Sequence, residues 1–408
     1  MFAPVVAAQA FWTTRQQADV QKLPIGQGPP AMSSSPDADV LLTPPSQAET
    51  ALLARGVLSA LGGPANLTDV QLLLTTALFH AMTGYAIEPT HVAPITAEDF
   101  AQGLSRRNMM FRQRIVQIML LIALSSRPLT ATTVACLTEF AAALKVDEDM
   151  IGVAQRFAEG ALDLASIDFV RNGYLGSVSA DRLAALHAVS LDKSWGQIVN
   201  DQALTDRWAA LETLPPDTLG RGVADFYRDR GFVYPGRPDS APPLLAQHDW
   251  AHVLADYGTS LENEIEVFAF MARANDDPRA FSLLAMVLSL FETGYLATGA
   301  GLFEASPGHL ASAGMATRLA DAMRRGALTT GSHDLLDLDW FAIADRPLTV
   351  VRREIGLVDK SADALQAGSA GPWQAGGITE YQLNSARQAA LRAGIEYRPW
   401  TPTPTPAT

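Results

Sequence analysis

The sequence predicts an all-α protein with two helical domains, and three observations lead to this prediction. Nearly every periodic segment between about residues 49 and 358 places its apolar residues at helical spacing. The short alternating runs of β-branched and aromatic residues that strands need do not occur in this region. A connection containing Gly173 and Gly176 separates two groups of helix caps and breakers. At 408 residues, the chain is long enough for two or three domains that each bury a core.

Composition divides the chain further. Residues from about Leu23 to Gln47 are rich in Pro, Gly and Ser, and the last residues alternate Thr with Pro; neither composition favours packing into a core. We therefore expect four segments: a flexible N-terminal segment (1–48), a helical accessory domain (49–175), a second helical domain (190–360) and an irregular C-terminal tail (361–408).

Caps and breakers define the expected helices of the first domain, which should form a compact bundle of about five helices. A segment from about Glu49 is followed by helices over Asp69–Met82 after Thr68, Arg106–Leu124 after Ser105, Ala131–Leu144 after Thr130, and Glu148–Leu162 after Asp147.

In the second domain several helices should begin with Pro, since the first turn tolerates a missing backbone donor. The expected helices are Pro216–Arg230, Pro243–Tyr257, Leu261–Ala274, Pro278–Tyr295, Pro307–Arg325 and Leu348–Ile355.

Charge and cysteine content limit the function classes. With 30 basic and 43 acidic side chains the formal net charge is −13, which disfavours nucleic acid as a partner, because binding phosphates needs a basic face. The single Cys136 excludes an internal disulfide and a Cys-rich zinc site. The longest apolar stretches are shorter than the ~20 residues of a membrane span, and the apolar first residues lack the basic start of a signal peptide. We expect a cytoplasmic protein, with peripheral attachment to a membrane left open.

The segment His248-Asp249-Trp-Ala-His252, followed after eleven residues by Glu264, is the most informative part of the sequence. Residues three and four apart share a helix face, so His248, Asp249 and His252 should project from one turn. The other histidines are isolated in sequence. They are therefore expected to be surface or packed residues.

A continuous helix would hold Glu264 ~18 Å from His252, too far to share an ion. The sequence predicts a break between them, in which Gly258 closes one helix in the left-handed conformation and Thr259-x-x-Glu262 caps the next. The resulting hairpin would bring two imidazoles and two carboxylates around one cation. This ligand set suits zinc, or manganese, iron or cobalt.

Two further stretches have the character of lipid-contacting surfaces. The helix expected to contain Phe281–Phe291 is apolar around almost its whole circumference, which is typical of a core helix and also of a wall for a prenyl chain. Its candidate lipid-binding residues are Leu284, Leu288 and Phe291. Arg106, Arg107, Arg112 and Arg114, interleaved with Met109, Met110 and Phe111, form either a membrane-binding surface or a solvated helix face with Met and Phe packed inward.

The spacing of the His-Asp-His-Glu residues resembles that of the ubiquinone (coenzyme Q) biosynthesis protein 4 family, whose hallmark is His-Asp-x-x-His, eleven residues, Glu. Similar motifs flank it over about residues 190–360. They are Leu214-Pro-Pro-Asp-Thr-Leu-Gly220, Val223-Ala-Asp-Phe226, Arg324-Arg-Gly326, Leu338-Asp-Trp340, Arg346-Pro-Leu348 and Val351-Arg-Arg-Glu-Ile-Gly-Leu357. The Ala-rich helices of the first domain and their Phe169-Val-Arg171 ending resemble the tellurite-resistance TerB-like helical domain.

The first resemblance implies a metal-dependent enzyme, in effect a lyase, that removes the ring carboxylate of a polyprenylated hydroxybenzoate-type acid oxidatively and replaces it with a hydroxyl. It also implies contact with other quinone-biosynthesis enzymes at a membrane surface. The metal would polarise carboxylate or ring oxygens, and Asp249 and Glu264 could instead move protons during catalysis.

Alternatives remain open at this point. The protein could be a non-catalytic scaffold that binds a prenyl lipid and holds a structural metal. The adjacent His248-Asp249 pair also fits a metal phosphohydrolase of the His-Asp type, although these need another upstream His and none lies between His187 and His248. A zinc protease is disfavoured because Asp249 stands where that motif has its Glu base.

Overall fold

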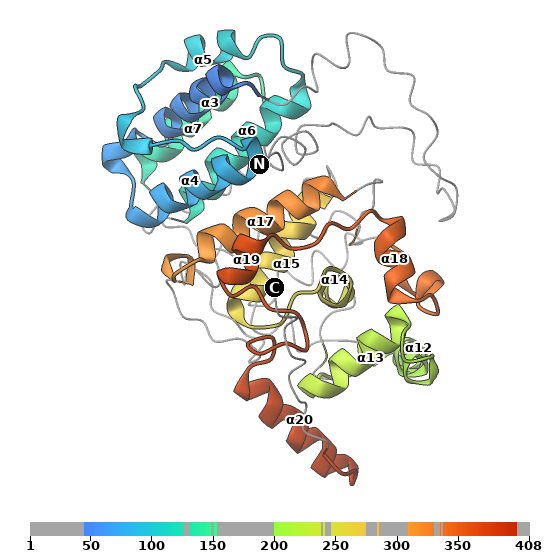
Figure 1. The fold of residues 1–408 in the computed structure, drawn as a ribbon. Coiled ribbons are helices and arrows are strands. Elements are labelled where there is room, and N and C mark those ends of the chain that lie inside the picture. Colours follow the sequence, from blue (N-terminus) through green and yellow to red (C-terminus); the bar gives the residue numbers. More distant parts are fainter. Residues whose placement is uncertain are drawn as a thin grey trace.

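The computed structural model describes residues 45–125, 130–147, 151–152, 200–237, 240, 246–274, 284, 309–329, 335 and 338–397. Within these ranges the regular structure is helical and no strand occurs; Thr218 and Pro347 form an isolated antiparallel bridge. The predicted all-α class is confirmed (Figure 1).

Five helices pack together in the first block. They are α3 (Gln47–Ala60), α4 (Asp69–Thr83), α5 (Ala97–Gly103), α6 (Met109–Leu124) and α7 (Ala131–Ala143). Phe100 of α5 is fully buried against α3, where a Cβ on Gly56 would lie 2.2 Å from its ring. Helix α5 was not expected from the sequence, and the expected helix Glu148–Leu162 lies almost wholly outside the described residues.

Side-chain caps explain where these helices begin. Thr68 and Gln71 form a capping box at the start of α4, and the Thr130 hydroxyl accepts a hydrogen bond from the Thr133 amide at α7, as predicted. The expected start of α6 after Ser105 is wrong. The helix begins three residues later, because Asn108 Oδ1 accepts the Phe111 amide at 2.8 Å.

The second block contains α12 (Gln202–Ala209), α13 (Leu219–Arg230), α14 (Gln247–Ala255), α15 (Leu261–Ala274), α17 (Met315–Leu328) and α18 (Leu348–Glu354). Helices α15 and α17 lie side by side (Figure 1). Their approach requires Gly326, since a Cβ there would lie 2.1 Å from the Phe270 carbonyl oxygen. Helix α14 packs against both α13 and α15.

The C-terminal region corrects one expectation. Instead of an irregular tail from residue 361, the structure has α19 (Ala362–Gln366) and α20 (Glu380–Ala393). Helix α20 begins with a Thr379–Gln382 capping box and ends at Gly394 in the left-handed conformation. These signals were present in the sequence, but the Gly- and Pro-rich residues before them obscured the helix.

The two blocks meet where α4 packs against α17 (Figure 1). The expected boundary between domains, within residues 172–194, lies outside the described residues, as does nearly all of the 1–48 segment. The two-domain division therefore stays a prediction. Across the part of the chain that the structure describes, no helix has both the length and the apolar character needed to cross a membrane.

Candidate metal centre

Helix α14 carries three of the four predicted ligands in a single turn. Every residue from His248 to Ala255 is buried, because α13, α15 and α18 pack against this helix. His248, Asp249 and His252 therefore face protein rather than water, as do the neighbouring side chains of α15. His252 is 0% exposed and Glu264 is 2% exposed.

The chain breaks between α14 and α15 as the spacing requires, but a different residue closes α14. Asp256, not Gly258, adopts the left-handed conformation, with φ of 62°. Gly258 has another role: a Cβ at this position would lie 2.4 Å from the Gly377 Cα. The glycine is needed for the close approach of the C-terminal segment, and Asp tolerates the left-handed position better than most residues do.

The predicted capping box at Thr259 is also displaced by one residue. The Ser260 hydroxyl accepts the Asn263 amide at 3.3 Å and caps α15. Thr259 Oγ1 instead accepts a hydrogen bond from Arg230 Nε and donates to Gln382 Oε1, at 2.7 and 2.8 Å. Through these two hydrogen bonds, Thr259 connects the turn between α14 and α15 to α13 and α20.

The hairpin brings Glu264 to the His-Asp-His turn. Glu264 Oε2 lies 3.5 Å from His248 Nε2 and 3.3 Å from His252 Nε2. Asp249 Oδ1 lies 3.6 Å from His248 Nε2. His248, Asp249 and His252 offer ligand atoms that all lie within 4.8 Å of one another, and this buried group could hold a metal ion.

Packing and hydrogen bonding orient the two imidazoles. The ring of His248 stacks on Phe268 of α15, and that of His252 stacks on Phe226 of α13. His252 Nδ1 lies 3.3 Å from the Tyr257 carbonyl oxygen, which can only accept, so the proton belongs on Nδ1. In the neutral ring, which a metal ion would require, Nε2 then carries the lone pair. This atom is buried and makes no hydrogen bond with any described residue.

The two carboxylates have different surroundings. Burial raises the pKa of Asp249, although His248 and a hydrogen bond from Tyr227 partly oppose this shift. Burial would also raise the pKa of Glu264, but the adjacent His252 and His248 outweigh it and lower the value to about 2. Glu264 is therefore ionised at neutral pH, as a ligand or a base must be.

Two residues that the sequence analysis did not single out support this centre from α13. Tyr227 Oη donates a hydrogen bond to Asp249 Oδ2. Arg230 is fully buried, and its Nη2 donates to the Pro372 and Gly377 carbonyl oxygens at 2.8 and 3.1 Å. Tyr227 and Arg230 lie on the same helix face as the apolar Val223 and Phe226. Polar groups on an otherwise apolar face are the sequence feature that indicates these two residues.

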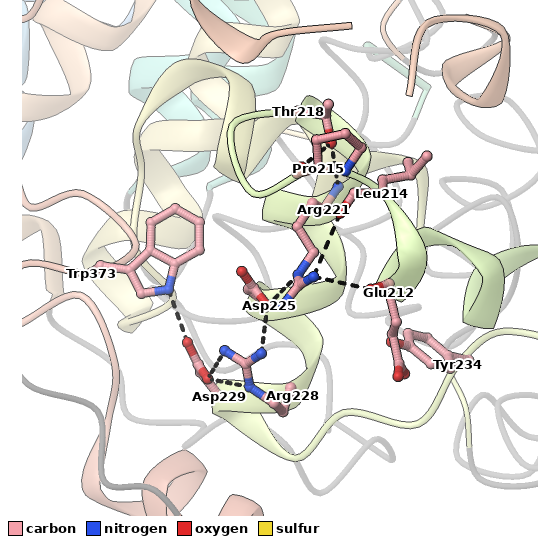
Figure 2. A network of polar contacts seen from close by, with 10 residues as sticks. All are labelled: Glu212, Leu214, Pro215, Thr218, Arg221, Asp225, Arg228, Asp229, Tyr234 and Trp373. Carbon is pink, nitrogen blue, oxygen red and sulfur yellow. Dashed lines mark hydrogen bonds and ion pairs between the residues drawn. The ribbon is translucent and has the colours of Figure 1, made fainter. Parts of the chain in front are cut away.

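The opposite face of α13 carries a partly exposed polar network (Figure 2). Asp225 pairs with Arg221 and Arg228, Trp373 Nε1 donates to Asp229, and Tyr234 Oη donates to Glu212. Figure 2 shows Arg221, Asp225, Arg228 and Asp229 along the helix and Trp373, Glu212 and Tyr234 reaching it from other segments. The predicted metal ligands take no part in this network, so the polar groups of α13 divide into an inner and an outer set.

The structure places few of the predicted lipid contacts. Leu284 is fully buried within the hydrophobic core, whereas Leu288 and Phe291 lie outside the described residues. The arginine stretch does not form one exposed basic face: Arg107 and Arg114 are buried, and Arg107 pairs with Glu49. Phe111 is packed inward, but Met109 is 44% exposed.

The remaining described histidines lie apart from the centre, as expected. His80 and His91 are exposed, and His309 Nδ1 lies 2.9 Å from Glu262. A scan against protein-family models, a search of curated proteins and a search of solved structures each found no match to this chain.

Proposed function

We propose that this protein binds a divalent metal ion through His248, Asp249, His252 and Glu264, and acts with it on a prenylated aromatic acid in quinone synthesis. The convergence of two buried imidazole Nε2 atoms on one oxygen of Glu264 carries the metal part of this proposal. A buried imidazole nitrogen without a hydrogen bond is unfavourable unless another group, such as a cation, occupies its lone pair.

The donor set fits zinc or a first-row ion such as manganese, iron or cobalt, since these accept mixed imidazole and carboxylate ligands. When bound, such an ion would act as a Lewis acid toward carboxylate or ring oxygens of the substrate. The surrounding residues would exclude water and fix the ligand orientations. In an alternative arrangement Asp249 or Glu264 would accept a proton from the substrate instead of binding the ion.

The substrate class rests on the family resemblance alone, and the motifs that carry the resemblance lie around the candidate centre. In the motif Leu214–Gly220, Thr218 caps α13 and the Gly220 amide donates to the Ala344 carbonyl oxygen at 2.8 Å. Gly326 of the Arg-Arg-Gly motif allows α17 to approach α15. These motifs position the helices that carry or cover the proposed metal ligands.

Metal analysis of the purified protein tests the binding step. We expect the wild type to retain stoichiometric zinc, manganese, iron or cobalt, and His252→Ala to lose it, because this substitution removes a fully buried ligand. His80→Ala is the matched control, since His80 is exposed on α4. Equal metal content in the His252→Ala variant and the wild type would rule out the centre as described.

Turnover distinguishes the proposed enzyme from the lipid-binding scaffold. The metal-loaded protein is incubated with a prenylated 4-hydroxybenzoate, dioxygen and a two-electron reductant, so that one oxygen atom enters the product and the other leaves as water. Carbon dioxide and the ring-hydroxylated product are measured. Metal-dependent product supports the enzyme. Tight retention of the prenyl compound without product supports the scaffold, in which the metal has a structural role.

A further inference from the structure

The two oxygens of Asp249 have different partners. Oδ2 accepts a hydrogen bond from Tyr227 Oη of α13, while Oδ1 faces the ligand group at 3.6 Å from His248 Nε2. The hydrogen bond joins two separate helices within the core, because both Tyr227 and Asp249 are buried. It therefore fixes which carboxylate oxygen turns toward the site.

The Tyr227 ring has little freedom to move away from this bond. Its ring centroid lies 5.0 Å from that of Trp208, 5.4 Å from that of Tyr234 and 5.7 Å from that of Phe232. These rings surround the phenol on several sides, and close packing restricts it to one orientation. The hydroxyl is consequently held in place before any ion binds.

We infer that Tyr227 is a positioning residue that makes Asp249 a one-oxygen ligand, by occupying Oδ2 and presenting only Oδ1 to the ion. This inference rests on the proposed metal-binding function. A carboxylate that binds through both oxygens takes two coordination positions, whereas one held through a single oxygen takes one. Tyr227 thereby leaves a position at the ion for an oxygen of the substrate.

The test compares Tyr227→Phe with the wild type, using Co²⁺ as the probe. Outer-shell partners of metal ligands typically contribute about 10–100-fold to metal affinity, so we expect the Kd for Co²⁺ to rise by about this factor. The visible absorption of bound Co²⁺ should also change, because Asp249 becomes free to bind through both oxygens. A purely structural role for Tyr227 would leave that spectrum unchanged.

Tyr234→Phe is the matched control. It removes a hydroxyl from the same aromatic cluster, but that hydroxyl points to Glu212 on the outer network (Figure 2). This variant should bind Co²⁺ with the affinity and spectrum of the wild type. Circular dichroism establishes that each variant is folded before the comparison.

The outcomes separate this inference from the proposed function. If the wild type binds no Co²⁺, the proposed centre fails. If the wild type binds it and Tyr227→Phe matches both its Kd and its spectrum, only the role of Tyr227 is overturned. Should Tyr227→Phe not fold, a crystal structure of the Zn²⁺-loaded wild type decides: binding by Asp249 Oδ1 alone supports the inference, and binding by both oxygens overturns it.

Discussion

Buried cationic side chains in the second block are stabilised to very different degrees. The guanidinium of Arg230 donates to Thr259, Phe226, Pro372 and Gly377, and these oxygens satisfy its fork of donors. Burial lowers the pKa of Arg230 to about 9, although nearby acidic groups including Glu264 oppose the shift. It therefore stays charged at neutral pH and places a positive charge near the carboxylates of Asp249 and Glu264.

Lys360 is the opposite case. Its side chain is 4% exposed, and Nζ makes no hydrogen bond within the described ranges; the nearest acidic partner is Asp256 Oδ2 at 3.9 Å. The ammonium lies 4.8 Å from the Tyr257 ring centroid, a weaker substitute for hydration. Burial accordingly lowers the pKa of Lys360 from 10.5 to about 8 despite the opposing charge of Asp256.

This shift predicts that Lys360→Met stabilises the protein at neutral pH. Below pH 8 both the folded and the unfolded state hold the proton, so the folded state bears the full cost of the buried charge, about 1–3 kcal/mol. Between pH 8 and 10.5 the folded state releases the proton while the unfolded state keeps it. The free energy of unfolding of the wild type therefore rises with pH over this interval, and the advantage of Lys360→Met should shrink.

Urea unfolding of both proteins at pH 7 and pH 10 measures this difference. Asp256 is 40% exposed and can be hydrated when it loses its partner, so its charge should not cancel the gain. A variant that is less stable than the wild type at pH 7, or whose advantage is the same at both pH values, would show that Lys360 is not a destabilising buried charge.

At the scale of elements, the site depends on the turn between α14 and α15. The Gly258 amide donates to the Ala370 carbonyl oxygen and the Thr259 amide to the Gly377 carbonyl oxygen, at 2.9 and 2.8 Å. The C-terminal segment thus holds both residues of the turn. The position of Glu264 follows from this turn, because α15 begins two residues later.

Gly258→Ala should therefore destabilise the fold by about 2–4 kcal/mol, since the added methyl would meet the Gly377 backbone, which cannot turn away as a side chain can. The displaced turn should also weaken metal binding. Thermal unfolding and Co²⁺ titration measure the two effects.

Gly152→Ala is the control for this substitution. Position 152 is helical, and no described atom lies within 4 Å of the place that an added methyl would occupy, so we expect unchanged or slightly higher stability. If Gly258→Ala behaves like Gly152→Ala, the close approach of Gly258 to Gly377 does not limit the fold.

At the scale of the whole molecule, residues far apart in sequence complete the centre. The segment 369–382 supplies carbonyl acceptors to Arg230 of α13 and, through Ala370, to the turn and to Asn263 Nδ2 of α15. Gln382 of α20 bonds both the hydroxyl and the carbonyl of Thr259. The C-terminal segment therefore joins α13 to the hairpin that carries the ligands.

Ending the chain after Ser361 should abolish stable metal binding, because Arg230 would lose acceptors and become an incompletely satisfied buried charge. Ending it after Tyr397 removes residues 398–408, the Thr-Pro residues together with Arg398 and Trp400, and should leave metal content and unfolding temperature near wild-type values. Purification of both truncated chains with metal analysis tests this. Full metal content after truncation at Ser361 would show that the C-terminal segment does not support the centre.

The sequence by itself determined the helical class, the caps at Thr68 and Thr130, and the approach of Glu264 to His248 and His252. Each of these depends on local chemistry, namely helical periodicity, a side-chain oxygen within reach of nearby amides, and a break of suitable length between His252 and Glu264. The motif spacing was informative because residues four apart must share a helix face.

Tertiary structure alone decided which residues complete the site. Asp256 rather than Gly258 closes α14, and Gly258 instead makes room for Gly377, a residue more than 100 positions away in the sequence. The partnership of Tyr227 with Asp249 likewise depends on how α13 packs against α14. These contacts depend on how distant parts of the chain pack together. Local spacing therefore places His248, Asp249 and His252 on one helical turn, and the packing of the whole chain orients that turn.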